Sequence, residues 1–80
     1  MPSQDVLDRI RKIVATLFNV PLDEVDDASS PQSIPAWDSM GQLTLILELE
    51  QEFGIEMTHE RIQQITDVAS IARVVEEAGV

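Results

Sequence analysis

One stretch of the chain decides the fold: DSMGQLTLILELEQEFGI, residues 38–55. It predicts a helix over 39–53, because Asp38 or Ser39 suits the N-cap position and Gly54 suits the C-terminal stop. At about 100° per residue, one arc of this helix is apolar along its length. We expect that arc to face the core: Leu45, Ile46, Leu49 and Phe53.

A second apolar arc lies on roughly the opposite side of the same helix: Met40, Leu43 and Leu47. Polar residues lie beside it: Thr44, Glu50 and Gln51. A small helical domain rarely buries both sides of one helix, so we expect this second arc to be exposed. We call Met40, Leu43 and Leu47 the docking stripe, and predict that it binds partner proteins together with Thr44 and Glu50. The alternative is that the loop over 20–37 folds back and covers it.

Three further helices follow from the same periodicity. The first spans 6–18, is capped by Ser3 or Asp5, and ends at Asn19 and Pro21. Its predicted buried face is Val6, Leu7, Ile10, Ile13, Val14, Leu17 and Phe18, and Ala15 falls on the polar side. A short helix is expected around 60–65. A last helix runs over 68–78, capped by Asp67, with a buried face of Val68, Ile71, Ala72 and Val75. The prediction is a single all-α domain over 1–80, a small four-helix bundle with three main helices and one short helix.

Residues 20–37 are predicted to form a long loop between the first two main helices. Three prolines interrupt this segment, and the run from Asp26 to Ser30 is typical of turns. A loop of this length is unusual in a compact domain and is often functional. A short helical turn is possible around 22–25. The expected anchors to the core are Leu22, Val25, Ile34 and Trp37.

Composition limits the function classes. The chain has 80 residues, no cysteine and a formal charge of -10. Residues 20–80 hold thirteen acids against Arg61 and Arg73, a sum of -11. Such a charge disfavours nucleic acid and anionic membranes as partners and favours basic proteins or cations. The N-terminus lacks the pattern of a signal peptide, and no apolar run approaches the length of a membrane span. We therefore expect a cytoplasmic monomer without membrane insertion.

Catalytic and metal-binding motifs are not found in the sequence. His59 is the only histidine, so neither a histidine-based metal site nor a nucleophilic triad is supported. An EF-hand counted from Asp26 would place Pro31 at position six and Trp37 at position twelve, where glycine and glutamate are required. Ser39 is the more interesting candidate, because a phosphate ester at the start of a helix would meet unpaired N–H groups. The alternative for Ser39 is a plain N-cap.

The chain resembles the acyl carrier protein family. The signature of that family is Asp-Ser-Leu opening a helix that ends in an acidic run, Phe and Gly-Ile, and here it corresponds to Asp38-Ser39-Met40 followed by residues 43–55. The likeness continues through residues 65–68, and Val25 lies fourteen residues before Ser39 as in the family. The resemblance implies a non-enzymatic carrier. Ser39, with Asp38 as its motif neighbour, would receive 4′-phosphopantetheine from coenzyme A.

The same resemblance implies the partners. They would be holo-acyl carrier protein synthase or another phosphopantetheinyl transferase. The loaded carrier would then bind acyl-transferring, ligase or synthase enzymes that have basic surfaces and belong to fatty-acid, polyketide or related biosynthesis.

Some positions depart from the family: Gly41 and Thr44 stand where acids are common, and Ile34 and Trp37 replace the usual loop anchors. These departures predict a specialised carrier. Asp38-Ser39-Met40-Gly41 also resembles D-alanyl carrier proteins, so an aminoacyl cargo is an alternative. An unmodified acidic helical adaptor is another.

Overall fold

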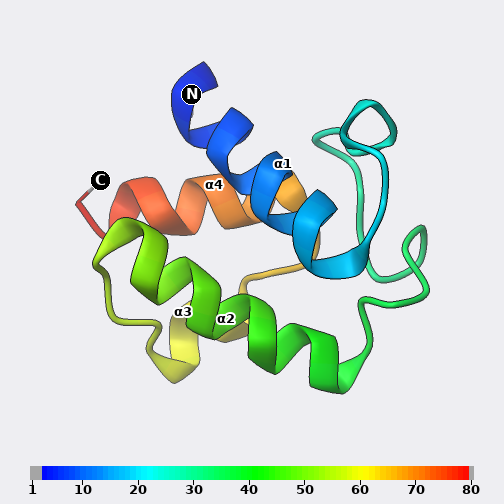
Figure 1. Ribbon diagram of the computed structural model, residues 1–80. Helices are drawn as coiled ribbons and strands as arrows, with labels where there is room; N and C mark the ends of the chain where they lie inside the picture. The colour runs from blue at the N-terminus through cyan, green and yellow to red at the C-terminus, as the bar shows by residue number, and fades with distance from the viewer. Residues whose placement is uncertain (1–2, 80) are drawn as a thin grey trace.

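A computed structural model describes residues 3–79 and contains only helices and loops over that range (Figure 1). The elements are α1 (Gln4–Phe18), the short 3₁₀ helix η1 (Leu22–Glu24), α2 (Ser39–Phe53), α3 (His59–Gln63) and α4 (Val68–Glu77). The predicted all-α bundle of three main helices and one short helix is confirmed. The predicted ends of the three main helices agree with the structure to within two residues, and α3 lies slightly earlier than expected.

Local side-chain chemistry explains where the helices begin and end. Ser3 caps α1, since its Oγ accepts a hydrogen bond from the Val6 N–H at 3.2 Å. Asn19 ends α1 in the left-handed conformation, and Gly54 ends α2 in the same way. Asp67 and Ser70 form a reciprocal capping box at the start of α4. These interactions span only three or four residues, which is why the sequence predicted the helix ends well.

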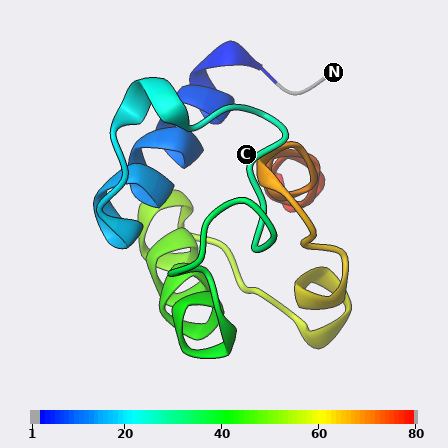
Figure 2. The same cartoon turned by 90° about the vertical axis from the view of Figure 1, so that its right-hand side faces the viewer.

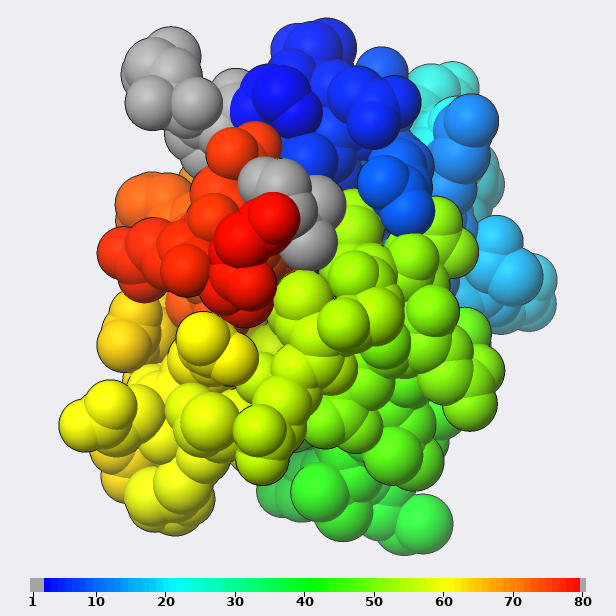
Figure 3. Space-filling model, turned by 90° about the vertical axis from the view of Figure 1, so that its left-hand side faces the viewer, coloured from blue at the N-terminus to red at the C-terminus, as the bar shows by residue number. Residues whose placement is uncertain are grey.

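The helices α1, α2 and α4 enclose one core, and α1 packs against both of the others (Figure 1). Figure 3 shows the start of α1 and the ends of α2 and α4 meeting on one face, where the Ser3 N–H donates to Glu76 Oε1 at 2.9 Å. The predicted buried faces of α2 and α4 are confirmed, except that Phe53 is only half-buried. Ala15 corrects the prediction for α1: it is buried, and it lies one turn after Arg11, on the side of α1 that packs against η1 and the long loop.

The long loop crosses one end of the bundle, between α1, α2 and α4 (Figure 2). Val25, Ile34 and Trp37 anchor it in the core as predicted. Leu22 does not, since 41% of it is exposed. The reason is that η1 lies outside the core, and the chain enters the core only where it becomes extended at Val25.

Hydrogen bonds from both sides hold the loop in place. Arg11 of α1 donates from Nε to the Val25 carbonyl at 2.7 Å and from Nη2 to the Leu22 carbonyl at 3.2 Å. The first N–H groups of α4 donate to loop carbonyls, from Val68 to Ser29 and from Ala69 to Asp27. The loop carbonyls thereby pair with N–H groups that the start of a helix would otherwise leave without a partner. None of the helices described is long and apolar enough to cross a membrane.

Candidate functional site

Ser39 is the first residue of α2 and is exposed to solvent. The N-cap is Asp38, whose Oδ1 accepts a hydrogen bond from the Gly41 N–H at 2.9 Å. The Asp38 carbonyl accepts the Gln42 N–H at 2.8 Å. The alternative of Ser39 as a plain N-cap is therefore wrong. Its hydroxyl is left available for another role.

Two backbone donors remain near the Ser39 hydroxyl. The N–H groups of Ser39 and Met40 have no hydrogen-bond partner within residues 3–79, whereas those of Gly41 and Gln42 are paired with Asp38. Unpaired donors at a helix start favour a neighbouring anion. The Asp38 carboxylate opposes this effect through its own negative charge. A phosphate on Ser39 would thus meet two amide donors and one nearby acid.

Trp37 fixes the start of α2 against the rest of the molecule. Its indole is buried and stacks on the Phe18 ring of α1, with centroids 5.6 Å apart and planes at 20°. Its Nε1–H donates to Gln42 Oε1 at 2.6 Å. This hydrogen bond gives the N–H of the buried indole a partner and connects the loop to the first turn of α2. Ser39 therefore lies two residues after a side chain that is anchored in the core.

Gly41 allows this close packing. A Cβ atom at that position would lie 2.5 Å from the Ala36 carbonyl oxygen and 2.8 Å from Phe18 Cε1. Any larger residue would push the first turn of α2 away from the loop. In the sequence, Gly41 was noted as a departure from the acyl carrier pattern and as part of the D-alanyl-carrier-like motif Asp38-Ser39-Met40-Gly41, but not as a packing residue. The signal available was a glycine in the first turn of an otherwise strong helix, where it lowers helix propensity and so implies a packing reason.

A shallow hollow of about 380 Å³ lies beside Ser39. Loop residues, the first turn of α2 and one residue after α3 line it: Pro31, Trp37, Asp38, Ser39, Gln42 and Ile65. The lining combines apolar surface with a carboxylate and an amide. A flexible polar chain attached to Ser39 has room to lie there.

The docking stripe is exposed. Met40 is 78%, Leu43 65% and Leu47 59% accessible, so the alternative that the loop covers the stripe is wrong. The loop instead covers the end of the bundle. Thr44 is exposed beside the stripe and donates its hydroxyl to the Met40 carbonyl at 3.2 Å. Glu50 is half-buried, and its Oε2 accepts the Met57 N–H at 3.0 Å.

Other chemistry-bearing residues do not converge on a site. His59 is exposed at the start of α3 and contacts Gln63 at 3.0 Å between their Nε2 atoms. In the part of the chain that the structure describes, no group of three or more histidine or acidic side chains is placed to hold a metal ion. The site that the geometry singles out is the start of α2.

The protein-family model described as "Phosphopantetheine attachment site" matches residues 8–75, from within α1 to within α4. The match includes the loop, the Asp38-Ser39 pair and all of α2.

Proposed function

Because the chain belongs to the phosphopantetheine attachment site family and so carries covalent 4′-phosphopantetheine, we propose that Ser39 is the residue that bears this group. One observation carries the proposal: Asp38 takes the N-cap role and leaves the Ser39 hydroxyl exposed at the start of α2. The two unpaired amides beside it suit a phosphate, and the hollow of about 380 Å³ suits the attached arm. The residues present therefore fit the group.

The chain contributes position rather than catalysis. Members of this family are carriers, and a separate phosphopantetheinyl transferase modifies them. In that transfer the Ser39 oxygen forms a bond to the phosphorus of coenzyme A that carries the pantetheine. The bond from this phosphorus to the oxygen between the two phosphates breaks, so adenosine 3′,5′-bisphosphate leaves, and the hydroxyl proton is released. When bound, the group supplies the thiol that the cysteine-free chain lacks. Asp38, Trp37 and Gly41 fix the start of α2, where Ser39 is exposed to solvent.

The cargo we propose is an acyl group held as a thioester, delivered among enzymes of fatty-acid, polyketide or related biosynthesis. The exposed docking stripe and the excess of acids in residues 20–80 support partners that present a basic surface around a small apolar contact. Charge steering of this kind gives fast, transient binding. A carrier that visits several enzymes in turn needs both properties.

Intact-mass measurement tests the attachment residue. Incubation of the protein with coenzyme A, magnesium and a promiscuous phosphopantetheinyl transferase should add one phosphopantetheine. Ser39→Ala should abolish the addition. Ser33→Ala is the matched control, since Ser33 is another exposed serine in the neighbouring loop, and it should load fully. Equal modification of Ser39→Ala, or none of the wild type, would overturn the proposal.

The cargo on the arm requires a second measurement. Mass spectrometry of the protein isolated from its native cells should show phosphopantetheine with an acyl group on the arm. An amino acid on the arm would instead support a D-alanyl or aminoacyl carrier. A permanently unmodified chain would support an adaptor that uses the docking stripe alone.

A further inference from the structure

The three glutamates of α2 have different environments. Glu52 is paired with Arg9, whose Nη2 lies 3.0 Å from Glu52 Oε2, and Glu50 accepts the Met57 N–H. Glu48 is exposed and forms no hydrogen bond or ion pair with any residue in 3–79. Of the three polar residues beside the docking stripe, Thr44 and Gln51 carry no charge, and Glu50 is the half-buried acceptor of the Met57 N–H. Glu48 is therefore the one glutamate of α2 whose carboxylate is free to attract a basic group.

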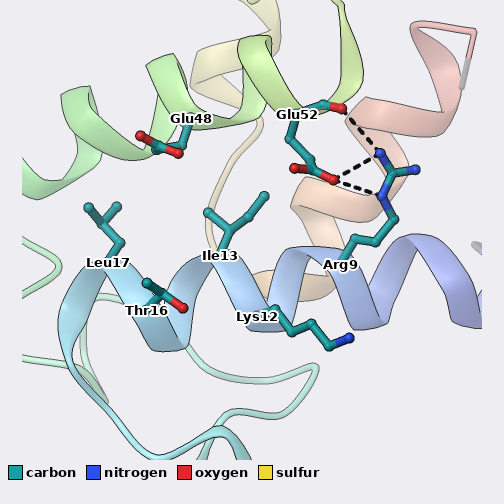
Figure 4. A pocket seen from close by; sticks show the side chains of 7 residues that line it. All are labelled: Arg9, Lys12, Ile13, Thr16, Leu17, Glu48 and Glu52. Carbon is teal, nitrogen blue, oxygen red and sulfur yellow. Dashed lines mark hydrogen bonds and ion pairs between the residues drawn. The ribbon is translucent and has the colours of Figure 1, made fainter.

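Glu48 lies over a groove of about 630 Å³ between α1 and α2, which Figure 4 shows. Ile13 and Leu17 are half-buried and form its apolar floor, below Glu48. The ion pair of Arg9 with Glu52 closes one end and neutralises both charges there. Lys12 also lines the groove, but its side chain extends away from Glu48. The open end thus combines an apolar floor with one uncompensated negative charge.

We propose that this groove binds an arginine side chain of a partner protein seated on the docking stripe. The inference rests on the proposed carrier function for the existence of such a partner. Arginine fits because its aliphatic stem can pack on Ile13 and Leu17 while its guanidinium pairs with the Glu48 carboxylate through two parallel hydrogen bonds. Glu48 directly follows Leu47, about 100° further around the helix. The partner footprint therefore extends from the stripe towards α1.

A defined peptide tests the proposal by NMR. The ¹⁵N-labelled, unmodified protein is titrated with acetyl-Leu-Arg-Leu-amide, and separately with the same peptide carrying citrulline in place of arginine. Citrulline keeps the shape of arginine and removes its charge. The largest amide shifts should fall on Ile13, Leu17 and Glu48. The citrulline peptide and the Glu48→Gln variant should each raise Kd by about fivefold, as expected for a charge-assisted contact in a partly covered groove.

Two control variants show whether the loss of affinity is specific to the Glu48 carboxylate. Glu24→Gln removes an exposed acid on η1, away from the groove, and should change Kd by less than about twofold. Ser39→Ala should bind the arginine peptide like the wild type, so the outcome does not depend on the attachment residue. The proposal is overturned if Glu48→Gln binds as tightly as the wild type, if the largest shifts fall on residues 23–27, or if no saturable shift occurs.

Discussion

Truncating Leu49 to alanine should remove much of the stability of this protein, whereas the same change at Leu47 should not. The two residues are two positions apart on α2 and therefore point about 200° away from each other. Leu49 is 0% exposed in the core, and Leu47 is 59% exposed on the docking stripe. Leu49→Ala and Leu47→Ala thus remove the same side-chain atoms, one set from the core and the other from the surface of the same helix.

The expected magnitudes follow from this burial. Removing a fully buried leucine side chain costs about 2–5 kcal/mol, from lost transfer free energy and the cavity left behind. A domain of 80 residues has a free energy of unfolding of roughly 4–12 kcal/mol, so Leu49→Ala removes a large share of it. A loss of about 3 kcal/mol corresponds to a fall in Tm of about 12–24 °C for this size. Leu47→Ala should cost less than about 1 kcal/mol, because its side chain is already mostly hydrated.

Thermal unfolding followed by far-UV circular dichroism measures both effects. The rate of Ser39 loading by a phosphopantetheinyl transferase, measured well below either Tm, adds a functional readout. Leu47→Ala should load more slowly although it remains folded, since it removes part of the docking stripe. If Leu47→Ala lowers Tm as much as Leu49→Ala, the stripe is packed against the protein and the reasoning is refuted. If it loads at the wild-type rate, the stripe does not contact that enzyme.

Two further changes test the packing of the loop and of the first turn of α2. Gly41→Ala should lower the free energy of unfolding by about 1–2 kcal/mol, because the clash of its Cβ with the Ala36 carbonyl and the Phe18 ring exceeds the gain in helix propensity. A Tm at or above that of the wild type would contradict this. Arg11→Met should cost about 1–3 kcal/mol, because it leaves the Val25 and Leu22 carbonyls without their guanidinium donor. It should also speed amide hydrogen exchange in the loop more than in α4, and an equal increase in both would argue that Arg11 does not hold the loop.

Several features of the fold and the site could be predicted from the sequence because they depend on local interactions. The helix boundaries follow from caps such as Asp67 and stops such as Gly54, which act within a few residues. The opposite orientations of Leu47 and Leu49 follow from helical periodicity alone. Ser39 was predicted to be the attachment residue from the resemblance of residues 38–55 and 65–68 to the acyl carrier protein family. Its place at the start of α2 follows from the local capping pattern.

The amino-acid sequence by itself thus determined the helices and most of their buried arcs, and it led to the proposal that Ser39 is modified. Only the tertiary structure decided that Leu22 stays outside the core, that Gly41 must lack a side chain, and that Glu48 is the free glutamate of α2. The physical reason is that each of these depends on groups distant in sequence. Glu52 is neutralised by Arg9, forty-three residues earlier, and Gly41 is confined by the Phe18 ring of α1. Periodicity shows which way a side chain points, but which group it meets depends on how the helices and the loop pack together.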